Sequence, residues 1–139
     1  MKAKFIASGL FGGIINFFLG WLVYGKLLMP FLNANTIHYE GLTKEMPVLW
    51  MLVISCLATG YFLAFIFKRW AGISTLKGGL IGGLIIGFFI AVMYDFSLMS
   101  MWNLYNLKAI LVDALATVVI YGITGAAIGW GLAVREKKE

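Results

Sequence analysis

The chain has 139 residues, of which 62% are apolar and only 12% are charged, and its formal net charge is +5. Soluble domains contain about 45–50% apolar and about 25% charged residues, so a water-soluble fold of this size could not bury so much hydrocarbon. The basic residues lie at the ends of apolar segments instead of forming a patch, which argues against nucleic acid as a partner. The single cysteine, Cys56, excludes a disulfide within the chain and a zinc site built from several cysteines. These features indicate an integral membrane protein surrounded by membrane lipids.

Four segments are long and apolar enough to cross a bilayer as helices, which takes about 20 residues each. In chain order they are 5–31, 47–67, 78–98 and 109–134. Lys2 and Lys4 before the first segment are typical of a signal peptide, but the apolar run is too long and no cleavage site follows, so we expect a retained helix. Pro47 suits the first turn of the second helix, where a missing N–H is tolerated. The sequence therefore predicts an all-α membrane protein, a four-transmembrane-helix bundle forming a single domain over residues 1–139.

The basic residues are distributed unevenly between the two sides of the membrane. Eight of the 11 belong to the two termini and the second loop, namely Lys2, Lys4, Lys68, Arg69, Lys77, Arg135, Lys137 and Lys138. The other three are Lys26, Lys44 and Lys108. Because short cytoplasmic loops have an excess of lysine and arginine, both termini are predicted to be cytoplasmic, with the first and third loops facing outward.

The first segment resembles the third when the chain is shifted by 70 residues. Ten of 25 positions are then identical, including Gly9-Leu10 with Gly79-Leu80, Gly12-Gly13 with Gly82-Gly83, and Tyr24 with Tyr94. The second and fourth segments align best where Thr59-Gly60 meets Thr124-Gly125. This pattern favours a tandem duplication of a two-helix hairpin, with repeats at 5–70 and 75–134 and a pseudo-two-fold axis along the membrane normal. The alternative is convergent glycine-rich packing without duplication.

Small residues form stripes on three of the predicted helices. The stripes contain Gly9, Gly13, Asn16 and Gly20 on the first helix, Gly79 and Gly83 on the third, and Gly122, Gly125 and Gly129 on the fourth. Small residues let helices in lipid approach closely, so we expect the stripes of the first and third helices to meet at the pseudo-axis. On the fourth helix, the glycines point away from a face bearing Asp113, Thr117 and Thr124. We expect one of these two faces to turn inward and the other to be available to a partner chain.

A polar cluster is predicted at the outer edge of the membrane, because helical rise brings Lys26, Asp95 and Asp113 to one level. The candidate outer pocket consists of Lys26, Tyr94, Asp95, Asn103, Asn106 and Asp113. A structural interpretation pairs Lys26 with one of the carboxylates and makes Asn106 a helix cap. A functional interpretation makes the pocket a site for a hard cation, a proton or a polar headgroup. Asp95 is expected to lie away from the glycine stripe of its helix, so it reaches Asp113 only if the helix unwinds or if it lies between the third and fourth helices.

The segments Gly20-Trp21-Leu22-Val23-Tyr24 and Tyr94-Asp95, followed by Asn103, Asn106 and Asp113, resemble families of small four-helix bacterial inner-membrane proteins that contain a domain of unknown function. The resemblance covers nearly the whole chain. It implies location in the cell inner membrane, and it implies no reaction.

Three classes of function remain open, and none of them requires an enzyme or a cofactor, because no catalytic constellation or metal-ligand spacing is visible. The favoured one is association, as a homo-oligomer or as a subunit of a membrane complex. The second is transport of an ion or solute, along a polar route lined by Asn16, Ser55, Thr59, Thr117 and Thr124. The third is binding of a lipid or another apolar ligand, for which the adaptable side chains of 88–102 are suited. Asn16, near mid-membrane, is expected to hydrogen-bond to a facing group.

Overall fold

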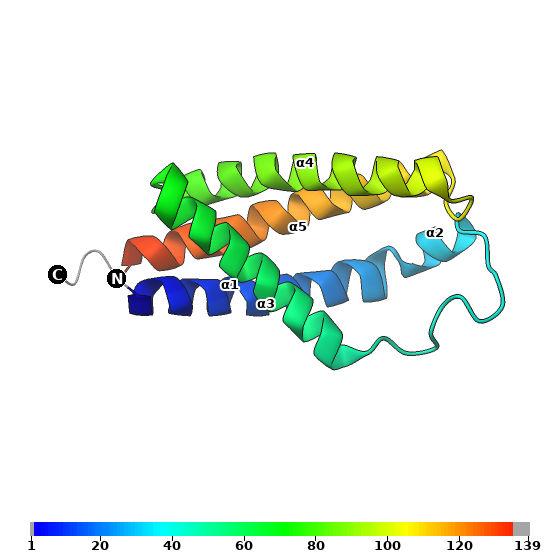
Figure 1. Cartoon of the computed structure of the whole chain (residues 1–139), viewed down its shortest axis with the longest axis horizontal. Coiled ribbons are helices and arrows are strands. Elements are labelled where there is room, and N and C mark those ends of the chain that lie inside the picture. The colour runs from blue at the N-terminus through cyan, green and yellow to red at the C-terminus, as the bar shows by residue number, and fades with distance from the viewer. Residues whose placement is uncertain (1, 135–139) are drawn as a thin grey trace.

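The computed structural model describes residues 2–134, and four of its helices are long and apolar enough to cross a membrane. The chain contains α1 (Lys2–Leu22), the π-helical turn η1 (Val23–Leu27), the short α2 (Met29–Ala34), α3 (Leu49–Ile66), the π-helical turn η2 (Phe67–Ala71), α4 (Leu76–Met101) and α5 (Leu107–Val134). The prediction of an all-α multi-pass bundle is confirmed. α1 begins and α5 ends at the same end of the molecule, as an even number of crossings requires (Figure 1).

The observed spans are Ala3–Leu27, Leu49–Ala71, Leu76–Met101 and Leu107–Val134, so most predicted boundaries shift by a few residues, and two of the shifts involve proline. The first spanning helix ends at Leu27 instead of continuing to residue 31, and a separate short helix follows with Pro30 in its first turn. Proline has no N–H to continue the helical ladder, so the chain begins a new helix there. α3 begins at Leu49, and its N-cap residue, Val48, has an extended backbone. Pro47 therefore lies outside the helix.

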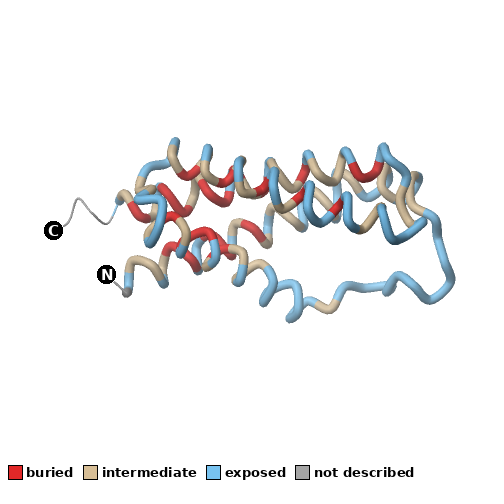
Figure 2. Tube along the Cα trace, turned by 45° about the horizontal axis from the view of Figure 1, so that its top comes forward, coloured by how far each residue is buried: buried red, intermediate tan, exposed pale blue. Residues whose placement is uncertain are grey.

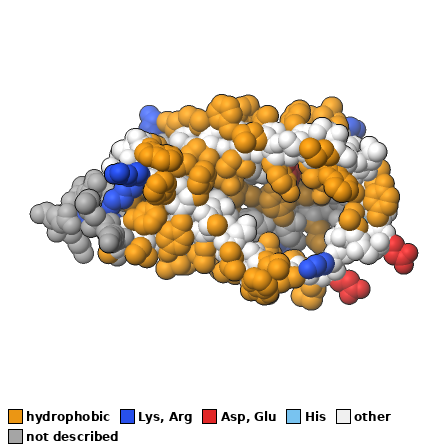
Figure 3. All heavy atoms as spheres, in the orientation of Figure 1, with side chains coloured by type: hydrophobic (Ala, Val, Ile, Leu, Met, Phe, Trp, Pro, Cys, Tyr) orange, Lys and Arg blue, Asp and Glu red, His pale blue; other side chains and the backbone are white. Residues whose placement is uncertain are grey.

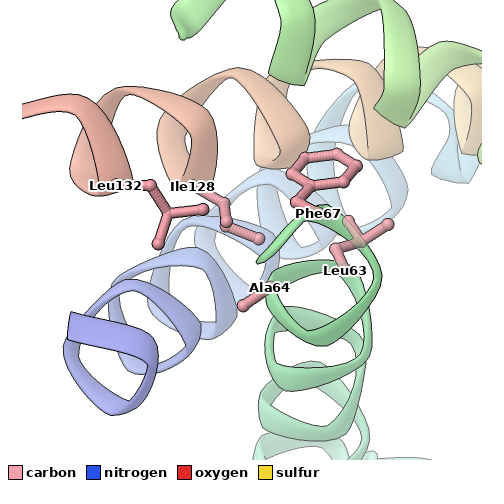
Figure 4. Close-up of a cluster of buried hydrophobic side chains, with 5 residues drawn as sticks. All are labelled: Leu63, Ala64, Phe67, Ile128 and Leu132. Carbon is pink, nitrogen blue, oxygen red and sulfur yellow. The ribbon is translucent and has the colours of Figure 1, made fainter. Parts of the chain in front are cut away.

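Helix α5 is the centre of the bundle, since it contacts α1, α3 and α4. α4 lies along α5 for most of its length, whereas α3 crosses α1 obliquely and diverges from the bundle towards its own N-terminal end (Figure 1). The buried residues are concentrated at the end where α1 begins and α5 ends, and along α4 and α5 (Figure 2). At that end a cluster of buried side chains joins α3 to α5, and it consists of Leu63, Ala64, Phe67, Ile128 and Leu132 (Figure 4).

The glycine stripes of α1 and α4 do not meet each other, contrary to expectation. The α1 stripe packs on α3, where a Cβ added to Gly60 would lie 2.8 Å from the Cα of Gly13. The α4 stripe packs on α5, where a Cβ added to Gly125 would lie 2.9 Å from the Cα of Gly83. The main-chain oxygen of Gly9 also faces Gly60, and that of Gly79 also faces Gly125. Each stripe therefore holds together the two helices of its own hairpin, because glycine permits a backbone-to-backbone approach that any side chain would block.

Both faces of α5 turn inward. Gly122, Gly125 and Gly129 are buried against α4, while Thr124 is buried towards α1. Asp113 and Thr117 of that second face are only half-buried, so the expectation of a face available to a partner chain stays a prediction. Gly20 differs from its predicted packing role, since a Cβ added there would meet nothing within 4 Å.

The outer surface of the bundle is apolar. In α3 only 17% of the most apolar 18-residue window is buried in the chain, and hydrophobic side chains cover most of the visible face between the two ends (Figure 3). Acidic side chains lie at the end opposite the termini in that view. A surface of this kind needs lipid, not water, around the middle of the helices.

Candidate functional site

Asp95 lies in the interface between α4 and α5 and is only 2% exposed. The buried residues of α4 recur at every fourth position, as Gly79, Gly83, Gly87, Ala91 and Asp95. Rows of residues four apart wind slowly around a helix and follow a partner that crosses it. Asp95 therefore continues the glycine stripe, and the expectation that it lies away from the stripe is wrong. No unwinding is involved, because α4 is continuous from Leu76 to Met101.

Asp113 of α5 is the partner of Asp95. The two carboxyl groups lie within hydrogen-bonding reach of each other, while Oδ2 of Asp95 is buried without a hydrogen-bond partner. Asp113 is half-buried, in the first half of α5. Within residues 2–134, no ion pair joins either carboxyl group to a lysine or an arginine. The predicted meeting of the two carboxyl groups is thus present, in the position between the third and fourth spanning helices.

Lys26 does not pair with either aspartate, contrary to the structural interpretation of the sequence. Its ammonium group lies over the ring of Trp21, 5.6 Å from the ring centroid. Both residues are exposed at the outer end of the first span, where a cation over an indole face is stabilised without losing its hydration. The acidic pair therefore lacks the counter-charge that the sequence assigned to it.

Tyr24 connects α1 to the polar side of α5. Its hydroxyl lies 3.2 Å from Oγ1 of Thr117 and donates to the main-chain oxygen of Asp113 at 3.5 Å. Tyr94, the residue that matches it in the repeat, is 66% exposed. The depth of Tyr24 could be read from the sequence, but its contacts depend on how α1 and α5 pack.

Asn106 has a structural role as the cap of α5, since its Oδ1 accepts a hydrogen bond of 2.9 Å from the N–H of Ala109. Its Nδ2 donates to Oδ1 of Asn35 at 2.7 Å, and its N–H donates to the main-chain oxygen of Asn35 at 3.3 Å. The N–H of Ile37 donates to the oxygen of Leu104 at 2.7 Å. These bonds tie the first loop to the third. Nothing in the sequence indicated this role for Asn35. Asn103, a predicted member of the pocket, is exposed in the third loop.

Tyr105 is half-buried next to the acidic pair and forms an isolated antiparallel bridge with Thr36. Burial raises the pKa of its phenol, and the negative charges of Asp113, Tyr94 and Asp95 raise this pKa further. Tyr105 therefore reports on the charge of the outer cluster from a position outside the spanning helices.

Asn16 lies near the middle of the first spanning helix and is bonded within the chain, as the sequence predicts. Its Nδ2 donates to Oγ1 of Thr124 at 3.2 Å, and the exposed fractions of the two residues are 8% and 0%. The bond joins α1 to α5 and engages the hydroxyl of Thr124 and one N–H of the Asn16 amide.

A groove of about 600 Å³ lies where α3 diverges from α1, with α5 as its floor. Figure 3 shows a hollow on this face of the molecule. Its polar residues include four of the five residues that the sequence assigned to a polar route, namely Asn16, Ser55, Thr59 and Thr117. Gly20 and Trp21 line the α1 side, and Leu49 and Leu52 line the α3 side. Residues 88–102 contribute nothing to this groove, so the apolar-ligand site expected there is a different place and stays a prediction.

The chain matches no protein-family model, no curated protein sequence and no solved structure. The groove offers apolar walls and a few hydrogen-bonding groups from α1, α3 and α5. The outer cluster offers two carboxyl groups, and the described residues contain no group of three or more histidine, cysteine, aspartate or glutamate side chains that could hold a metal ion.

Proposed function

We propose that this chain is a non-enzymatic, multi-pass protein of the inner membrane that binds one amphipathic, lipid-like molecule in the groove between α1, α3 and α5. The observation behind the proposal is the groove itself, about 600 Å³ of space with apolar walls and a strip of hydroxyl and amide groups. Small-molecule sites of about 300–1,000 Å³ have this make-up, with few polar groups set in a mostly apolar lining.

The shape of the groove favours a lipid-like occupant over the helix of a partner protein. The groove extends along α1 and η1 from Asn16 to Gly25, which is about 14 Å of helix. A spanning partner helix would need about 30 Å of contact. A molecule with one polar group and an apolar chain needs less, and Tyr24 with Thr117 supplies hydrogen-bonding partners at the outer end.

Association with a second chain has less support than the sequence suggested. The glycine faces that favoured it are occupied inside the chain, with Gly60 against α1 and Gly125 against α4. Transport also has less support, because the groove ends at the bond between Asn16 and Thr124. Beyond this bond, Ile128 belongs to the buried cluster, and its side chain fills the space that a Cβ on Gly12 would occupy.

Retention of lipid during purification tests the proposal. The protein purified in mild detergent should retain about one lipid-like molecule, detected by native mass spectrometry. Gly20→Leu and Leu52→Trp add side chains to the groove and should abolish retention. Leu115→Trp is the matched control, because Leu115 is exposed on α5 outside the groove. Equal retention in all four proteins would contradict the proposal, as would a co-purifying protein in place of the lipid.

The lone cysteine provides a second measurement. Cys56 lines the groove, so its alkylation should be slow in the lipid-bound protein and faster after delipidation. An equal rate in both states would mean that the groove is empty throughout.

We further propose that the termini are cytoplasmic and that the chain arose by duplication of a hairpin. Lys4, Lys68 and Lys77 belong to the end where the chain starts, which supports the orientation, while Arg135, Lys137 and Lys138 lie outside the described residues. Two relationships support duplication. Gly60 contacts Gly9 and Gly13 as Gly125 contacts Gly79 and Gly83. In the outer loops, the bond from Ile37 to Leu104 and the bond from Asn106 to Asn35 are related by a shift of 69 residues.

A further inference from the structure

The acidic pair between α4 and α5 presents a chemical problem that the fold does not solve with its own side chains. Asp95 is 2% exposed, its Oδ2 has no partner, and the group that faces it is the carboxyl of Asp113. Two ionised carboxylates can only accept hydrogen bonds. Without a donor or a positive charge between them, they would repel each other in a medium that solvates charge poorly.

The neighbouring groups do not supply that charge. On α1 and η1, the hydroxyl of Tyr24 is engaged with Thr117 and with the main chain of Asp113, and Lys26 lies over Trp21. In the third loop and on α4, the groups near the pair are the phenols of Tyr105 and Tyr94. Within residues 2–134, neither aspartate has a cationic partner.

A divalent metal ion does not suit this site. Calcium takes six to eight oxygen ligands and magnesium requires a nearly ideal octahedron, whereas here two carboxyl groups converge and no third acidic, histidine or cysteine side chain joins them among the described residues. A proton needs only two oxygen atoms. Placed between the carboxyl groups, it removes one negative charge and supplies the missing donor.

We propose that Asp95 and Asp113 form a proton-binding site in which one proton is shared between the two carboxyl groups at neutral pH. Asp113 is half-buried, whereas Asp95 is only 2% exposed, so in this proposal the proton exchanges with the medium through Asp113. Neither aspartate lines the groove, so the proton site is separate from the groove. Proton binding can therefore be tested independently of lipid binding.

Thermal unfolding of the full chain in detergent, measured between about pH 5 and about pH 9, tests the proposal. The unfolding midpoint of the wild-type protein should fall by several degrees as the shared proton is lost and the carboxylates repel each other. Asp95→Asn and Asp113→Asn each remove one charge and keep a hydrogen-bond donor, so each should abolish most of this fall. Glu45→Gln, in the exposed first loop, is the matched control and should keep the full fall.

Infrared spectroscopy of the wild-type protein detects the shared proton directly. The C=O stretch of a protonated carboxylic acid should be present at neutral pH, disappear as the pH rises, and be missing from the doubly substituted protein. Absence of the band from the wild-type protein at neutral pH would overturn the proposal, as would an equal alkaline fall of the midpoint in wild type and both single variants. Exchange of sodium for choline at constant ionic strength should change nothing. A sodium requirement would assign the pair to a metal cation instead.

Discussion

Asn16 and Thr124 form a buried side-chain hydrogen bond of 3.2 Å that joins α1 to α5 near the middle of the first spanning helix. The two partners are not equivalent. Thr124→Val leaves the amide of Asn16 unpaired in hydrocarbon, whereas Asn16→Leu leaves a hydroxyl that can bond to its own helix backbone. We therefore expect Thr124→Val to cost more stability, with the pair worth about 0.6–1.7 kcal/mol in a double-mutant cycle. Unfolding in mixed micelles measures it, and a larger cost for Asn16→Leu would contradict the assignment.

Gly60 and Gly125 should respond alike to substitution by alanine. A methyl group at either position would collide with the backbone of the facing helix, and overpacking of this kind costs about 1–3 kcal/mol. Gly20→Ala is the matched control, because its methyl group would enter open space. Thermal unfolding of the three variants checks the order, and a Gly20→Ala variant as unstable as Gly60→Ala would refute it.

Asn106→Ala should destabilise the outer end of the molecule, because it removes the cap of α5 and the bond from its amide to Asn35. Loss of a cap alone costs about 1 kcal/mol. Asn103→Ala removes an exposed amide of the same loop and should change stability by less than about 0.5 kcal/mol. Hydrogen exchange of the N–H of Ala109 offers a local measurement, and equal exchange in both variants would argue against capping.

The ionisation of Tyr105 should lower the stability of the folded chain at alkaline pH. Burial, followed by the charges of Asp113, Tyr94 and Asp95, raises its pKa above the ordinary value of about 10. The folded chain therefore holds this proton more tightly than the unfolded chain. The resulting stabilisation is complete below about pH 10 and is lost as the pH rises through the folded-state pKa.

A difference titration of tyrosinate absorbance between wild type and Tyr105→Phe should show this late ionisation. Asp113→Asn should move it only part of the way towards lower pH, because burial is the larger cause. Tyr39→Phe removes an exposed tyrosine and is the control. A late ionisation with the same amplitude in Tyr105→Phe as in the wild-type protein would disprove the assignment.

The sequence was sufficient to predict the number of spanning helices and the common depth of Asp95 and Asp113, because both depend on helix length and rise alone. It could not predict which glycine stripes meet, since a stripe accepts any neighbour that presents small residues. The position of Asp95 was mispredicted because a helical wheel treats neighbouring helices as parallel, while α4 and α5 contact each other along residues four apart. The groove could not be predicted either, because it depends on the angle at which α3 leaves the bundle.

The bonds between the first and third loops fasten the first hairpin helix to the bundle at this end more firmly than they fasten α3. Through Asn35, Ile37 and Asn106, the outer end of the first hairpin helix is fastened to the α4–α5 pair, while α3 is attached there only through residues 38–48. Residues 38–48 form the largely exposed link between that fastened end and the start of α3. Because the groove lies where α3 diverges from α1, we expect insertions or deletions in this link to change the width of the groove.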